Sequence, residues 1–583
     1  MLTITLFLSL RGPSVILHRI VKECIDMTPF KEIFEREYTW IAGFMRNVFR
    51  YPQKDAMISP SLGRKWSYNE LNEDANRLAN AFKNSGVTKG DVVMYLMLNS
   101  PEFVFTYVAT NKLHAVSAPI SYRLSPGEIA QSIDDNKPKV FLFDYAKRDD
   151  AMEGVRMAQF KPKYLICITE DCNPYTSPCS AAAVQPCNCM CCTYPSFIKG
   201  SSKENPVLDY DINIYDETVR LFTSGTTGRQ KGVPLTSINE VLSSHDVMIH
   251  FPMSNRDVTM NTTPWFHRGG LHCAGPCPAL YAGATMVIMD KFSSEATLDY
   301  VAKYKITFIV GVPTVLEDLA DEQEKLGRDI SSLKGIVTMG SPLERAACIR
   351  YQNVLTPNIY NGYGTTETFW NTFLRPCDLP ENAGTAGSSC VDDDVRVVKV
   401  YEDRRAEPED LAARDSEEIG EVIMKTPAKS PYCYSNNPEE TEKKFYKDYI
   451  YTNDLGTWDK NGFVTIIGRK DDMIISSGEN IYPTQIEEVL NTNPKVKDCM
   501  VTAVPDRIRG EIVTAYVVKS DESLTAHELD EFCKESAFIA NFKRPRYYRF
   551  ISQLPINATG KKLHYKLKEI ARQDLKNGLL IIV

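Results

Sequence analysis

The segment LFTSGTTGRQKGVPLT, residues 221–236, has the composition of a phosphate-binding loop. An apolar start typical of a strand is followed by a turn of Thr, Ser and Gly, then by Lys231 and a second apolar stretch. Glycines let backbone N–H groups point into one concavity, hydroxyls add donors and the lysine adds positive charge, so the segment suits a polyphosphate. The order from Gly225 is G-x-x-G-x-x-K, which is not a Walker A loop. A flexible polar turn is the alternative interpretation.

Five further segments carry polar side chains that could do chemistry. They are PWFHRGGLH at 264–272, NGYGTTE at 361–367, YTNDLG at 451–456, GRKDDMI at 468–474 and LPINATGKKLHYKL at 554–567. Taken singly, each has a structural interpretation: Tyr363 as a core aromatic, Asp454 as the cap of a turn and Lys561 as surface charge. Only their combination points to a site.

With the loop at 221–236, these segments resemble the acyl-adenylate-forming superfamily of acyl-CoA synthetases, luciferases and peptide-synthetase adenylation domains, and they occur in that family's order. The resemblance extends from about residue 30 to residue 570. It departs at Gln230, where the family usually has Pro, which should stiffen the loop less but removes no phosphate donor. It is weakest at 425–441, where the family often has Gly-Pro and Gly-Tyr.

The resemblance implies roles in binding ATP. Tyr363 would stack on adenine, Asp454 would accept hydrogen bonds from the two ribose hydroxyls, and Arg469 would contact ribose or phosphate. Thr366 would contact the α-phosphate, and Glu367 would hold Mg²⁺, because a hard cation prefers oxygen ligands. Thr226 is the second metal ligand that we expect. The other nucleotide or CoA contacts implied are Thr223, Ser224, Gly225, Thr227, Gly228, Lys231, Gly340, Ser341, Asn361, Gly362, Gly364, Thr365 and Gly478.

The small C-terminal part of the family carries a catalytic lysine, which Lys561 resembles. Its long stem would bring an ammonium group to the charge that builds on the α-phosphorus. Asp471 stands at the position of the interdomain hinge, and Gly478 in SSGENIYP would line a tunnel for the pantetheine thiol, where a side chain would block backbone approach.

The acyl pocket is less well defined by the sequence. Phe266 and His267 resemble the family's aromatic gate, although His267 could equally be a structural residue. Segments near Val312 and Ser341 would line the pocket, and Trp370 would shorten it. We therefore expect an apolar acid of moderate size.

The elements that must position these residues are those of an α/β protein. Residues 67–87 predict an amphipathic helix, and apolar runs at 92–98, 139–144, 163–169, 284–290 and 306–312 predict strands buried on both faces. By resemblance the large N-terminal domain, 27–470, has doubly wound α/β sheets and a small β-barrel. A small mobile α+β domain, 471–583, would carry Lys561. Residues 401–418 are charged and predict a solvated loop.

Composition excludes several classes of protein. The 583 residues are 43% hydrophobic and 24% charged, which is typical of a folded protein of more than one domain. A net charge of -8 argues against a general nucleic-acid binder. The leader, 1–26, is a poor signal peptide, since its basic residue follows its apolar run, so we expect a cytoplasmic protein without integral membrane association. The Cys-rich stretch 172–192 could hold a soft metal or be an insertion without chemistry.

The sequence thus predicts an ATP-dependent acyl-CoA synthetase that uses Mg²⁺ and coenzyme A, with a carboxylic acid as substrate and a homodimer left open. Two alternatives remain. An enzyme that loads a separate carrier protein would share the nucleotide site, but no carrier domain follows Lys561. A non-catalytic nucleotide-binding protein would be expected to have lost Lys561 or Glu367, and both are present.

Overall fold

The computed structural model describes residues 28–169, 190–224, 230–401, 403–476, 479–506, 509–536, 539, 541, 543–556 and 562–583. The leader and most of the Cys-rich stretch lie outside this part. So do six predicted site residues, Gly225, Thr226, Thr227, Gly228, Gly478 and Lys561.

The first sheet carries the predicted phosphate loop at one edge. All its neighbouring strands are parallel except the last two, which form an antiparallel hairpin. Their order is β7 (Met190–Thr193), β6 (Tyr164–Ile168), β5 (Val140–Asp144), β3 (Val92–Leu96), β4 (Val116–Pro119), β8 (Glu217–Ser224) and β9 (Gln230–Thr236). Cys191 and Cys192 at the end of the Cys-rich stretch form part of β7.

Helices cover both faces of this sheet, which explains its continuous apolar strands. Alternate residues of β5 contact different helices. Phe141 and Phe143 pack with α6 (Pro126–Asn136) and α7 (Arg148–Met157), whereas Val140 and Leu142 belong to the core with α4 (Tyr68–Asn84) and α5 (Pro101–Lys112). A strand buried on both faces cannot alternate polar and apolar residues.

Helix α4 confirms the amphipathic pattern predicted for 67–87. Ser67 starts it with a capping box: its hydroxyl accepts a bond from the Glu70 N–H at 3.2 Å, and the Glu70 carboxylate accepts one from the Ser67 N–H at 2.8 Å. The box thus satisfies two backbone donors that the helix start would otherwise leave unpaired. Leu71, Leu78 and Phe82 are fully buried on one face.

The second sheet supplies the predicted nucleotide motif. Its order is β16 (Ser388–Ser389), β15 (Phe369–Leu374), β14 (Ile359–Thr365), β13 (Gly335–Met339), β12 (Phe308–Gly311), β10 (Val258–Asn261), β11 (Thr285–Val287), β1 (Asp55–Ser59) and β2 (Arg64–Ser67). The strands from β14 to β1 are parallel. The outer face packs on α12 (Ser294–Tyr304), α13 (Pro313–Leu326) and α14 (Arg345–Val354).

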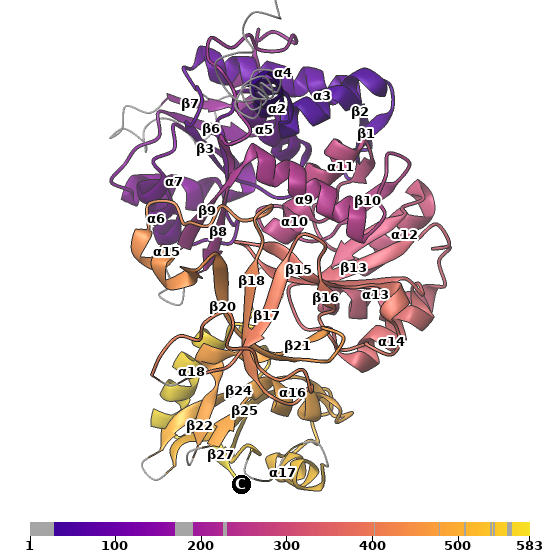
Figure 1. Cartoon of the computed structure of the whole chain (residues 1–583), viewed down its shortest axis with the longest axis vertical. Helices are drawn as coiled ribbons and strands as arrows, with labels where there is room; N and C mark the ends of the chain where they lie inside the picture. Colours follow the sequence, from indigo (N-terminus) through magenta and orange to yellow (C-terminus); the bar gives the residue numbers. More distant parts are fainter. Residues whose placement is uncertain are drawn as a thin grey trace, which may run out of the picture.

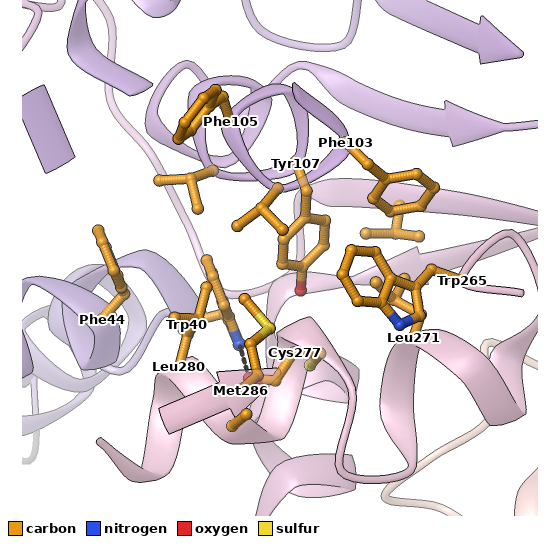
Figure 2. Close-up of a cluster of buried hydrophobic side chains, with 14 of the residues drawn as sticks. Trp40, Phe44, Phe103, Phe105, Tyr107, Trp265, Leu271, Cys277, Leu280 and Met286 are labelled. Atoms are coloured by element: carbon orange, nitrogen blue, oxygen red, sulfur yellow. Dashed lines mark hydrogen bonds between the residues drawn. The ribbon is translucent and has the colours of Figure 1, made fainter. Parts of the chain in front are cut away.

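The largest core lies between the two sheets, around aromatic side chains (Figure 2). Trp40 and Tyr107 lie 4.7 Å apart between ring centroids, and the Trp40 indole N–H donates to the Cys277 carbonyl at 3.0 Å. The helices that join this layer are α2 (Thr28–Glu37), α3 (Trp40–Arg50), α8 (Tyr194–Ile198), α9 (Ser237–His250), α10 (Arg268–His272) and α11 (Pro276–Ala282).

A third sheet occupies the position of the predicted small β-barrel. Over the residues that the structure describes, the sheet does not close, so it forms a half-barrel. Its order is β17 (Asp394–Val398), β18 (Gly420–Lys425), β20 (Tyr449–Trp458) and β19 (Phe445–Tyr446), and β21 (Val464–Arg469) also pairs with β20. The predicted loop at 401–418 connects β17 to β18. The half-barrel lies between the two α/β sheets and the small C-terminal domain (Figure 1).

The C-terminal domain is a mixed sheet with helices, drawn in yellow tones in Figure 1. Its strands are β22 (Ile474–Ser476), β23 (Glu479–Ile481), β24 (Val496–Asp506), β25 (Gly510–Lys519), β26 (Tyr547–Phe550) and β27 (Ile581–Ile582). Its helices are α16 (Pro483–Asn491), α17 (Ala526–Glu535) and α18 (His564–Lys576). The α/β class and the division into a large and a small domain are therefore confirmed. Within the described ranges, no helix is both long enough and apolar enough to cross a bilayer.

A buried lysine connects α9 with strand β15 and with the loop between β16 and β17. Lys429, 1% exposed, donates to Asp246 at 3.0 Å, to Asp393 at 2.6 Å and to the Trp370 carbonyl at 2.7 Å. Burial disfavours its charged form, but the two carboxylates outweigh burial and raise its pKa. We call Lys429, Asp246 and Asp393 the buried ion cluster.

A second buried lysine predicts a pH dependence of stability. Lys112, at the end of α5, donates to the amide oxygens of Asn72 and Asn205, each at 2.8 Å, and burial lowers its pKa to about 7. An unfolded lysine titrates near 10.4, so between these values the unfolded chain binds more protons and stability rises with pH. The stability gained by deprotonating Lys112 is complete above the unfolded pKa and is lost as the pH falls to about 7.

We expect Lys112→Met to flatten that rise. Between pH 7.5 and 9 the free energy of unfolding of the variant should increase less steeply than that of the wild type, by up to about 1.4 kcal/mol per pH unit. Denaturant titrations of both proteins at three pH values measure the difference. Parallel pH profiles would show that Lys112 stays protonated in the folded protein.

Candidate active site

Three predicted nucleotide residues meet where the second sheet touches the half-barrel. Tyr363 in β14 donates its hydroxyl to Asp454 Oδ2 at 2.7 Å. Asp454 Oδ1 lies 3.4 Å from the guanidinium of Arg469, its cross-strand partner in the β20–β21 ladder. Burial, and then the Asp454 charge, raise the pKa of Tyr363 well above its usual value, so the phenol stays protonated. The Asp454 carboxylate is fixed in position by these contacts.

Glu367 lies in the turn that follows β14. The Thr365 N–H donates to Thr368 Oγ1 at 3.1 Å and closes the turn, within which Thr366 and Glu367 follow. At Gly364 an added Cβ would lie 1.6 Å from the Phe369 carbonyl oxygen, so only glycine fits. At Gly362 it would lie 2.9 Å from Trp370.

Glu367 is an ionised carboxylate although it is 4% exposed. Burial by itself would raise the pKa of Glu367. The Lys444 charge and a hydrogen bond from the Tyr434 hydroxyl act in the opposite direction and outweigh burial, so the net pKa is below its usual range. Its oxygens suit Mg²⁺, which prefers hard oxygen ligands and is usually held by one or two carboxylates together with phosphates.

The phosphate hairpin lies beside this carboxylate. Thr223 in β8 is directly opposite Lys231 in β9, and Ser224 is opposite Gln230. The Lys231 ammonium is paired with Glu440 of α15 (Pro438–Lys444) and lies 5.2 Å from the centre of the Tyr434 ring. Tyr434 therefore touches both Lys231 and Glu367.

The predicted acyl-side residues are arranged around the ends of β12 and β13. His267 caps α10, and its ring lies 4.2 Å from that of Phe266, which in turn packs edge-on against Tyr122 at 5.5 Å. After β13, Gly340 has φ +84°, and an added Cβ would lie 3.7 Å from Val312. Gly340 thus lies beside Val312; that the two segments line the acyl pocket stays a prediction. Asn361 is buried and donates to the Thr385 carbonyl at 3.3 Å.

Two residues of this region have core contacts that the sequence did not indicate. Trp370, expected to shorten the pocket, is 2% exposed, donates its indole N–H to Asp246 and packs on Phe373 at 4.6 Å. Arg268 is 4% exposed and donates to the carbonyls of Thr366 at 2.7 Å and Lys429 at 2.6 Å. Burial lowers its pKa to about 10, so it remains charged at neutral pH.

The expected hinge connects the half-barrel to the small domain. Asp471 lies in the 3-10 turn η3 (Lys470–Asp472), two residues after Arg469. Asn453 donates to its carboxylate at 3.2 Å, and Lys568 of α18 donates to its carbonyl at 2.6 Å. Lys562, the neighbour of Lys561, is anchored within the small domain on Asp498 at 2.8 Å.

Comparison with known proteins identifies the family of this chain. The model of the AMP-binding enzyme family matches residues 44–431, and that of the AMP-binding enzyme C-terminal domain matches residues 485–561. A crotonobetaine/carnitine–CoA ligase of Escherichia coli O9:H4 (strain HS) is 30% identical over 533 residues, which cover 89% of this chain and 96% of the relative.

Solved structures give the same result. ATP-bound MatB from Rhodopseudomonas palustris is 26% identical with a TM-score of 0.76, over 91% of this chain and 99% of that one. O-succinylbenzoate coenzyme A synthetase (MenE) from Bacillus subtilis, in complex with ATP and a magnesium ion, is 25% identical with a TM-score of 0.75, over 90% and 99%. The chain therefore belongs to the AMP-binding enzyme family, in its acyl-CoA synthetase branch of AMP-forming acid–CoA ligases, which use ATP, Mg²⁺ and coenzyme A.

Proposed function

We propose that this enzyme converts a carboxylic acid and ATP into an acyl-adenylate and pyrophosphate, and then transfers the acyl group to coenzyme A with release of AMP. The observation that carries the proposal is the meeting of Tyr363, Asp454 and Arg469 beside the ionised Glu367 and the hairpin of Lys231. An aromatic ring, a fixed carboxylate and a lysine in this order match the adenine, ribose and phosphates of one nucleotide.

In the first step the substrate carboxylate attacks the α-phosphorus in line, and pyrophosphate leaves. The protein positions the reactants and offsets charge, as expected for phosphoryl chemistry. Asp454 orients the ribose, Thr366 faces the α-phosphate, and Lys231 and Lys561 neutralise charge that develops on phosphate oxygens. Glu367 and Thr226 would hold Mg²⁺, which would stabilise the negative charge of the phosphates.

In the second step the small domain rotates about Asp471, so that Lys561 leaves and the segment of Gly478 approaches. The pantetheine thiol then attacks the acyl carbonyl and displaces AMP. The position of Asp471, after the ladder that holds Asp454 and before the first strand of the small domain, supports this movement, because a hinge residue has to lie between the two parts that move.

For the acid we propose an apolar compound of moderate size. Phe266, Tyr122 and Val312 near the gate are apolar or aromatic. Arg268, the nearest charged residue in the sequence to His267, already donates to two backbone carbonyls, so it need not bind an anionic substrate group.

The test is pyrophosphate release from MgATP with a panel of acids, with and without coenzyme A. Medium-chain, aromatic, alicyclic and branched acids should be compared with crotonobetaine, carnitine, malonate, acetate and a C16 acid. We expect release that depends on one apolar class and turns over steadily only with coenzyme A. Release indifferent to coenzyme A would indicate a carrier protein as acceptor. Turnover of only acetate or only C16 acids would contradict the proposed substrate.

A further inference from the structure

The short helix α15 places a carboxylate beside the lysine of the phosphate hairpin. Glu440 is paired with Lys231. Four residues on, and therefore on the same face of the helix, the Lys444 ammonium donates to the Thr452 carbonyl at 3.1 Å and attaches the helix to the half-barrel. The helix lies beside α6 and the β8–β9 hairpin (Figure 1).

The Lys231–Glu440 pair is half-buried and next to open space. The two side chains are 15% and 24% exposed. They line a cavity of about 330 Å³ whose other walls include Ser132, Gln230 and Asn437. The Lys231 side chain thus has room to exchange Glu440 for another anionic partner without moving the core.

Glu440 has a second, more exposed partner on its own helix. Lys443 is 60% exposed and pairs with Glu440 at 3.0 Å and with Glu439 at 2.8 Å.

We propose that Glu440 is a positioning residue that stands in for the ligand: it occupies Lys231 in place of a phosphate. The inference rests on the proposed nucleotide site. Binding of MgATP then replaces this contact, since a triphosphate is the better partner for Lys231. The free energy of the contact is subtracted from the affinity for MgATP.

Calorimetric titration of ATP at saturating Mg²⁺, with no acid or coenzyme A present, tests this contact. Glu440→Gln keeps the shape of the side chain but removes the charge that competes for Lys231. We expect its dissociation constant for MgATP to fall about 2- to 5-fold, the range of a partly exposed ion pair. Glu439→Gln is the matched control, because Glu439 is 80% exposed on the same helix.

The outcomes separate this inference from the proposed function. Unchanged or weaker MgATP binding by Glu440→Gln overturns the inference while the wild type still binds ATP. A wild type that binds no ATP overturns the nucleotide site and the inference with it.

Discussion

Replacing Lys561 by alanine is expected to slow adenylation about 100- to 1000-fold and to leave transfer from a preformed acyl-adenylate to coenzyme A nearly intact. In the proposed reaction the ammonium is needed only while charge builds on the α-phosphorus, and one such preorganised donor has an effect of this order on the rate. Because Lys562 is held by Asp498 and by the Cys499 carbonyl at 2.5 Å, the segment next to Lys561 has a fixed attachment to the small domain.

The two half-reactions can be measured separately. Acid-dependent exchange of pyrophosphate into ATP reports adenylation, and consumption of synthetic acyl-AMP with coenzyme A reports transfer. Lys566→Ala, an exposed lysine on the same segment, serves as the control. Equal losses in both half-reactions of Lys561→Ala would refute this division of labour.

Glu367→Gln is expected to lower kcat/KM for MgATP on the order of 100-fold. Glutamine is isosteric and can still accept the hydrogen bond from Tyr434, so the change removes mainly the negative charge beside the phosphates. Loss of a metal ligand costs several kcal/mol of transition-state stabilisation, and each 1.36 kcal/mol is tenfold in rate.

The comparison that isolates the charge is Tyr434→Phe, which removes the hydrogen bond and leaves the carboxylate. Initial rates over a Mg²⁺ series should show a much higher Mg²⁺ requirement in Glu367→Gln and only a modest change in Tyr434→Phe. A Glu367→Gln enzyme with the Mg²⁺ dependence of the wild type would show that Glu367 does not hold the metal.

Much of the fold follows from local patterns. The strand β5 was predicted at 139–144 and spans Val140–Asp144, because a run of large apolar residues has few alternatives to a doubly covered parallel strand. The helix at 67–87 was predicted from its apolar spacing, and the structure places α4 at Tyr68–Asn84 behind the Ser67 cap. The half-barrel is different: whether a sheet closes depends on pairing between distant strands, which spacing does not encode.

The site was predictable only in part, for the same reason. The sequence, through its resemblance to a family, indicated Tyr363 and Asp454, and their side chains meet across 91 residues of chain. It did not indicate Lys444, since NPEETEKK is typical of a solvated charge run and only the packing of α15 on the half-barrel separates inward Lys444 from outward Lys443. Trp370 was expected to shorten the pocket because it is bulky and follows Glu367 closely, whereas its buried partner Asp246 lies 124 residues away and leaves no local signal.

The buried ion cluster has a consequence for how this sequence can change in evolution. Loss of Lys429 alone would leave Asp246 and Asp393 buried without their cation. Removing one partner of a buried ion pair typically destabilises a protein by about 3–5 kcal/mol. Replacing the whole group by apolar residues is often neutral. Single substitutions should therefore be selected against at each of these positions. Among relatives that lack a lysine at the position of Lys429, we expect the two acidic positions to have changed with it.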